Sequence, residues 1–188
     1  FYYRSGEKRH KLSKYIGEHH SDPMGRDNFW TTNASSLIFV ALSALRKLDY
    51  VGCPEYNHLY NLRLILKTLI IKYTKQNPVE ILFEKTLNDS QLSEFRSFLG
   101  FRDDIRSDIL TTALTALELF KEPEYDASLL TAHNTLDLSS LRKKPSIVYV
   151  IIPEEEIERL SLFISLFYTT VFKTLKEGGL NPENIPVY

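Results

Sequence analysis

Three groups of residues carry side chains that could support catalysis or metal binding. Cys53 and His58 form the one thiol and imidazole pair close in sequence, which is the arrangement of a cysteine nucleophile and its base. Cys53 lies between Gly52 and Pro54, and no third residue is marked to orient the imidazole of His58. We therefore favour a small apolar loop residue for Cys53, while a cytosolic hydrolase that uses this pair is kept as one alternative function.

The second group contains His10, His19, His20 and Asp22 near the N-terminus. Zinc-binding histidines on a helix are commonly four positions apart, a spacing that the adjacent His19 and His20 lack. The third group, the glutamates at 154–156, could be an acid/base or metal-binding cluster. A helix is predicted to begin there, and the attraction of its positive end for carboxylates already explains their position. We therefore expect no catalytic residue and no metal-binding residue in this chain.

Motifs that bind nucleotide phosphates are absent from the sequence. The Walker A pattern G-x-x-x-x-G-K-[ST], whose backbone amides and lysine hold the phosphates, occurs nowhere. We therefore expect no ATP or Mg²⁺ site, no cofactor and no enzymatic activity of this chain by itself.

Charge limits the partners that the chain could bind. It has 23 basic and 24 acidic side chains, so it has no overall attraction to nucleic acid or to an anionic membrane. Local clusters of basic residues remain as candidate docking positions, for an acidic protein or for a weak DNA contact, although solvated surface charge also explains them. These candidates are Lys8, Arg9, Lys11, Lys14, Arg142, Lys143 and Lys144.

Apolar content and cysteine content indicate the cellular setting. The longest apolar stretch, residues 160–172, has about 13 residues and is shorter than the ~20 that cross a bilayer, so we expect no membrane contact. Cys53 is the single cysteine, which excludes an internal disulfide and favours a reducing compartment.

Helices dominate the predicted structure up to about residue 120. Apolar residues recur at three- and four-residue steps in three stretches, as in amphipathic helices. These stretches run from Asp27 toward Gly52, from Glu55 to just before Asn77, and over residues 101–120. The second stretch has further apolar residues at Leu64, Ile65 and Ile71, so we expect other elements to surround it on several sides.

Two short helices are predicted between the second and third stretches. Asn77 precedes Pro78 and Glu80, which is the order of an N-cap, a proline at the first helical position and a carboxylate at the third. Asn88 and Gln91 have the spacing of a capping box. Each asparagine therefore predicts a helix start.

Residues 146–152 form a β-branched run between two prolines, which predicts a strand buried on both faces. A helix is predicted from Glu154 to Lys176, and 185–188 would begin a second strand. Strand, helix and strand form one parallel crossover, so we expect a chain cut from a larger α/β domain. We expect the helix to cover one face of the first strand.

The predicted architecture is therefore mainly α, a multi-helix bundle followed by one strand and one long helix of a truncated parallel α/β domain. We divide the chain into a basic lead-in segment (1–26), an all-α domain (27–144) and a piece of an α/β nucleotide-binding domain (145–188).

Several of these segments, in this order, resemble one known family. Residues 101–120, followed by L-D-L-S-S-L-R-K-K-P-S-I-V-Y-V-I-I-P at 136–153, resemble the TraG/TraD-like coupling ATPases of bacterial type IV secretion and conjugation. In that family this segment leads from an all-α domain into the nucleotide-binding domain. Asn28-Phe29-Trp30 is similar to the start of the all-α domain, and 185–188 to the strand before the Walker B acid. The chain departs from the family in having neither Walker motif.

The resemblance implies a docking role. The family's all-α domain recognises effector proteins or relaxase–DNA complexes, with adaptors or small accessory proteins, on the cytoplasmic side of the bacterial inner membrane. ATP and Mg²⁺ would bind elsewhere in a membrane-anchored, hexameric P-loop ATPase, and this chain would be soluble and monomeric. The near-neutral charge favours protein partners. A free-standing helical interaction or regulatory protein is the alternative.

Overall fold

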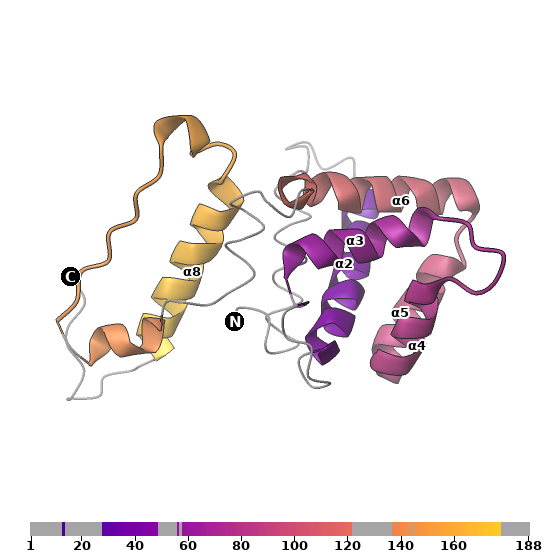
Figure 1. Cartoon of the computed structure of the whole chain (residues 1–188), viewed down its shortest axis with the longest axis horizontal. Helices are drawn as coiled ribbons and strands as arrows, with labels where there is room; N and C mark the ends of the chain where they lie inside the picture. Colours follow the sequence, from indigo (N-terminus) through magenta and orange to yellow (C-terminus); the bar gives the residue numbers. More distant parts are fainter. Residues whose placement is uncertain are drawn as a thin grey trace. The chain divides into compact units, whose positions relative to one another are not determined.

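The computed structural model describes residues 13, 28–48, 56, 58–121, 137–143 and 145–177. The chain divides into two units, Phe1–Ala132 and His133–Tyr188 (Figure 1). The first contains α2 (Asn28–Leu48), α3 (Leu59–Ile70), α4 (Pro78–Thr86), α5 (Asp89–Leu99), α6 (Asp103–Ala116) and the 3-10 turn η3 (Glu118–Phe120). The second contains the 3-10 turns η4 (Leu138–Arg142) and η5 (Glu154–Glu156) and the helix α8 (Ser161–Glu177). No helix of these residues is long and apolar enough to cross a bilayer.

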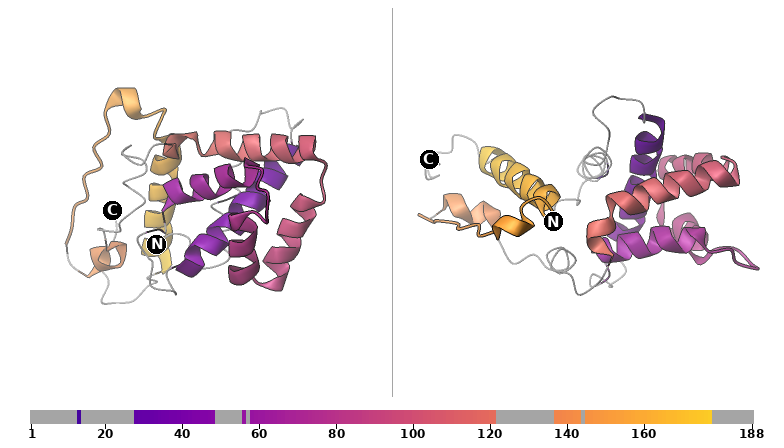
Figure 2. Two further views of the ribbon diagram at one scale, coloured as in Figure 1. Left: turned by 45° about the vertical axis from the view of Figure 1, so that its right-hand side comes forward. Right: turned by 90° about the horizontal axis from the view of Figure 1, so that it is seen from above.

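The helix α2 is the centre of the first unit. It contacts α3, α4, α5 and α6 (Figures 1 and 2). Its buried face includes Ala34, Ile38, Ala41, Leu42 and Leu45, which follow the predicted three- and four-residue steps. The alanines are fully buried, and their short side chains let neighbouring helices approach closely. The predicted helical bundle is therefore confirmed over these residues.

The two predicted caps are present. The backbone N–H of Val79 donates to Oδ1 of Asn77 over 2.9 Å, with Pro78 at the first helical position of α4. The N–H of Gln91 donates to Oδ1 of Asn88 over 2.9 Å, and the N–H of Asn88 donates to Oε1 of Gln91 over 3.2 Å. Each cap satisfies backbone N–H groups that lack a partner at a helix start.

The helix α3 is shorter than predicted, because it ends at Ile70. Nδ2 of Asn77 donates to the carbonyl of Thr68 over 3.0 Å and to that of Ile71 over 3.4 Å. Asn77 thus satisfies carbonyls at the end of α3 and an N–H at the start of α4. The expectation that other elements surround α3 was wrong for Leu64 and Ile71, whose side chains are exposed.

The predicted helix over 101–120 is formed by α6 and η3. Asp103 lies in the first turn of α6, where its carboxylate suits the positive end of the helix dipole. Ile109, Ala113 and Leu117 are buried, as their spacing predicted. The last turn narrows to a 3-10 helix, in which the N–H of Phe120 donates to the carbonyl of Leu117 over 2.9 Å.

In the second unit, the predicted strand at residues 146–152 is not formed. The segment is extended but pairs with no strand among the described residues (Figure 2). Ile147, Tyr149 and Ile151 are 77%, 80% and 89% exposed, and Val148 and Val150 are also exposed, at 42% each. The prediction that both faces are buried was therefore wrong, because an extended segment becomes a buried strand only where neighbouring strands and helices cover it.

The predicted helix from Glu154 begins later than expected. The glutamates at 154–156 form only the 3-10 turn η5, and a turn at 157–160 separates it from α8. The N–H of Leu160 donates to the carbonyl of Glu156 over 2.8 Å, and α8 starts at Ser161. The helix contacts η4 within the same unit and ends at Glu177, one residue past the predicted Lys176.

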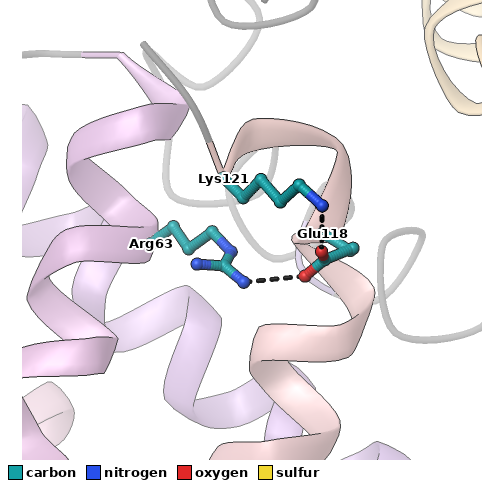
Figure 3. Close-up of polar contacts among 3 residues, drawn as sticks. All are labelled: Arg63, Glu118 and Lys121. Atoms are coloured by element: carbon teal, nitrogen blue, oxygen red, sulfur yellow. Dashed lines mark hydrogen bonds and ion pairs between the residues drawn. The ribbon is translucent and has the colours of Figure 1, made fainter.

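An ion-pair triad joins α3 to the turn η3 (Figure 3). Nη2 of Arg63 lies 2.7 Å from Oε2 of Glu118, and Nζ of Lys121 lies 3.1 Å from Oε1 of the same carboxylate. The hydrogen bond from Lys121 holds the pKa of the Glu118 carboxyl below its usual value, and the hydrogen bond and charge of Arg63 act in the same direction. Ionised Glu118 is therefore favoured in the folded chain.

We expect Glu118→Gln to lower the free energy of unfolding by about 0.5–1 kcal/mol at neutral pH, since Glu118 is half-exposed and solvent screens the pairs. The pKa of folded Glu118 is depressed, so its contribution is complete above 4.5, the ordinary glutamate value, and is lost as the pH falls through the folded pKa. Urea unfolding of both proteins across this range measures the difference. The exposed Glu84→Gln is the control, and a pH-independent difference would contradict the assignment.

Candidate docking groove

A groove of about 530 Å³ opens in the first unit, where the ends of four helices meet. Two of these ends are C-termini, of α3 and α5, and two are N-termini, of α4 and α6. Its lining comes from residues 69–73 and 75–77, Glu80 of α4, Phe98 and Leu99 of α5, and Asp103, Arg106, Ser107 and Leu110 of α6. The volume lies within the range of sites that hold a small ligand or a few side chains of a partner.

Apolar side chains are exposed along one edge of the groove. Ile70, Ile71 and Tyr73 are 49%, 53% and 42% exposed and are close together in sequence. Phe98 and Leu110 also line the groove but are buried. Single exposed apolar residues are common, whereas a contiguous group of them beside a hollow is typical of an interaction site.

Charged side chains line the same groove. Arg106 donates a hydrogen bond to Asp103, three residues earlier on α6. This hydrogen bond and the charge of Arg106 hold the pKa of the Asp103 carboxyl below its usual value, and the charge of Lys72 adds to the effect. Lys72 and Lys75 make no ion pair with a described residue. Glu80, in the first turn of α4, is the remaining carboxylate of the groove.

The early end of α3 is what opens this groove. Asn77 donates to the carbonyls of Thr68 and Ile71, so the chain leaves the helix at Ile71 and runs through 72–76 outside it. All residues from 70 to 76 are exposed. The lysines and apolar side chains of this segment are thereby presented at the groove instead of following the buried face of α3.

A second cavity, of about 260 Å³, lies between α2 and α5. Asn33, Ser36 and Glu94 line it together with apolar side chains. The hydroxyl of Ser36 donates to the carboxylate of Glu94 across it, and Nδ2 of Asn33 donates to the carbonyl of Phe29 over 2.7 Å. The Ser36–Glu94 bond joins the two helices, and the Asn33 bond lies within α2. These polar groups of the cavity already have partners, which makes it a weaker candidate for a binding site.

Most of the docking residues predicted from the sequence lie outside the described residues. This applies to Lys8, Arg9, Lys11, Lys14 and Lys144. Arg142 ends η4, and the next residue, Lys143, is exposed in the second unit. Whether these basic residues form one site therefore stays a prediction.

The predicted pair of Cys53 and His58 is only half described, since Cys53 lies outside the described residues. His58 precedes the first turn of α3, and the backbone N–H of His58 donates to the carbonyl of Tyr56 over 3.0 Å. Nε2 of His58 lies 3.2 Å from Nδ2 of Asn61. The described residues contain no group of three or more His, Cys, Asp and Glu side chains that could hold a metal ion.

The groove residues were not predicted as a site, although the sequence contained a signal for part of them. Ile71 is one of the apolar residues in excess of a single helical face. This excess predicts extra burial of α3, whereas the structure exposes Ile70, Ile71 and Tyr73. Apolar residues beyond one helical face, directly before an Asn-Pro stop, were thus the available signal.

A family model for conjugative DNA transfer by the type IV secretory system matches residues 5–186. The match spans almost the whole chain. The chain therefore belongs to this family of type IV secretion proteins, and the resemblance to TraG/TraD-like coupling ATPases is confirmed. No curated protein and no solved structure matches it.

Proposed function

We propose that this chain docks secretion substrates, or the adaptors that carry them, for a type IV secretion coupling protein. The observation that carries the proposal is the row of exposed apolar side chains, Ile70, Ile71 and Tyr73, beside a groove in the helical unit of a family member. Docking affinity commonly depends on a few apolar anchors that enter such a hollow. Effector proteins, relaxase–DNA complexes or a small accessory protein are the partners that the family suggests.

In this proposal the chain contributes recognition and not ATP hydrolysis. The sequence has no Walker A motif, so ATP and Mg²⁺ would bind to another part of the coupling machinery. The chain would act on the cytoplasmic side of the bacterial inner membrane, as a monomer or bound to its adaptor. Its net charge of −1 supports a protein surface as the main partner over DNA.

The test replaces one apolar side chain of the groove. We expect Ile71→Gln to reduce substrate transfer by about tenfold or more, because an apolar anchor that is buried on docking contributes about 1.5–3 kcal/mol. Transfer is counted in cells that carry the variant in place of the natural protein, and the unfolding midpoint of the purified variant should stay unchanged.

Leu64→Gln provides a matched control for this test. Leu64 lies on α3, is 48% exposed against 53% for Ile71, and does not line the groove. This variant should transfer substrate at the natural rate. Equal transfer by Ile71→Gln and Leu64→Gln would show that the groove is not used for docking.

A further inference from the structure

The positive charge of the groove is carried by two side chains that remain available. Arg106 is already paired with Asp103, so its charge is largely neutralised within α6. Lys72 and Lys75 lie on the exposed segment after α3, and neither forms an ion pair with a described residue. Glu80 is the one further carboxylate in the lining. A partner that brings carboxylates to Lys72 and Lys75 would therefore gain attraction that the groove does not already satisfy.

The apolar part of the groove adds a second requirement. Ile71 and Tyr73 alternate with the two available lysines, as Ile71, Lys72, Tyr73 and Lys75. A bound segment would thus meet apolar and cationic side chains within a few residues of each other. Only a partner with at least one large apolar side chain next to its acidic groups satisfies both.

We propose that the groove binds a short acidic segment of a partner protein, with carboxylates at Lys72 and Lys75 and one large apolar side chain against Ile71 and Tyr73. The inference rests on the proposed docking function and specifies the chemistry of its partner. It is a protein segment and not DNA, because the apolar side chains would gain nothing from a phosphate backbone, and the net charge of −1 gives the chain no overall attraction to nucleic acid.

The experiment measures binding of labelled peptides to the whole purified chain by fluorescence anisotropy. The probe is a short peptide in which glutamates flank a Phe-Leu pair. Two matched peptides replace the glutamates with glutamines or with lysines. We expect the acidic peptide to bind most tightly, the glutamine peptide more weakly and the lysine peptide not measurably, and we expect added salt to weaken the acidic peptide most.

Charge variants then locate the binding. Lys72→Glu combined with Lys75→Glu should lower the affinity for the acidic peptide by about tenfold or more, since repulsion replaces attraction at both positions. The control is Lys67→Glu combined with Lys85→Glu, which changes the net charge equally at exposed positions of α3 and α4 outside the groove. The affinity of this control variant for the acidic peptide should lie within about twofold of that of the natural protein, because the changed charges are away from the contact.

A third variant changes affinity in the opposite direction. Asp103→Asn removes the partner of Arg106 and adds positive charge to the groove. The acidic peptide should therefore bind more tightly to this variant than to the natural protein. General damage to the fold does not tighten binding, so this gain would separate a charge effect from a structural one.

Several results would overturn the inference. These are equal binding of the three peptides, no binding of any of them, equal weakening by the two double variants, or displacement of the acidic peptide by a DNA oligonucleotide that binds the groove more tightly. If Ile71→Gln abolishes substrate transfer while the acidic peptide does not bind, docking stands and the acidic partner is wrong. If the acidic peptide binds as expected while Ile71→Gln transfers normally, the docking function is wrong.

Discussion

Phe83→Ala should lower the free energy of unfolding of the helical unit by about 3–5 kcal/mol, the usual cost of removing a buried aromatic ring. The Phe83 side chain is fully buried, and its ring meets that of Phe95 edge to face with centroids 4.8 Å apart. Phe83 and Val79 are the two buried residues of α4, so this helix has few other attachments to the core. Urea unfolding followed by circular dichroism measures the loss.

Ile81→Ala is the matched control on the same helix. Ile81 is exposed, so removing its side chain leaves no cavity in the core. We expect this variant to cost less than about 1 kcal/mol, in the range of ordinary surface substitutions. A Phe83→Ala variant that was no less stable than Ile81→Ala would show that α4 is not anchored through this ring.

Asn77→Ala should lower the free energy of unfolding by about 2–4 kcal/mol, which is more than the loss of an ordinary helix cap. Its Oδ1 accepts the N–H of Val79, a cap that contributes about 0.5–2 kcal/mol. Its Nδ2 also donates to the carbonyls of Thr68 and Ile71, and each such hydrogen bond contributes about 0.5–1.5 kcal/mol. Asn77 is itself buried, so water replaces these bonds poorly.

Two further variants separate the functions of Asn77. Asn77→Asp keeps the acceptor for Val79 and removes the donor to α3, so it should show an intermediate loss. Asn88→Ala removes an exposed cap with no such second role and should cost about 1 kcal/mol. If Asn77→Ala and Asn88→Ala have the same unfolding free energy, the link between α3 and α4 contributes nothing to stability.

The parts of the fold that were predicted correctly depend on short-range signals. Asn88 and Gln91 are three residues apart, and the hydrogen bonds between them depend on no other part of the chain. The apolar positions that the helical repeat marks in α2, such as Ile38, Ala41 and Leu45, are buried, although Val40, Ser43 and Ala44 between them are buried as well. Such features are determined within one or two helical turns, so the sequence alone predicts them.

The features that were predicted wrongly depend on residues farther away. The apolar pattern of α3 continues to Tyr73, but the helix ends at Ile70, since Asn77 bonds to carbonyls six and nine residues earlier. Residues 146–152 have the composition of a strand, and strand formation requires hydrogen bonds from another strand. Neither condition can be read from periodicity within the segment.

The candidate site was missed for a related reason. The sequence directed attention to Arg142, Lys143 and Lys144 because they are consecutive. The groove instead combines the end of α3 with parts of α4, α5 and α6 that lie up to about forty residues apart. Only folding brings Lys75 and Arg106 to the same surface.

The exposed segment 71–76 also makes the groove sensitive to proteases. Lys72 and Lys75 are sites for trypsin, and Tyr73 is a site for chymotrypsin, on backbone that lies outside any helix. Proteases cut where exposed, irregular chain can enter their active sites. A molecule seated in the groove would cover these peptide bonds, so the rate of cleavage there reports occupancy without any label on the partner.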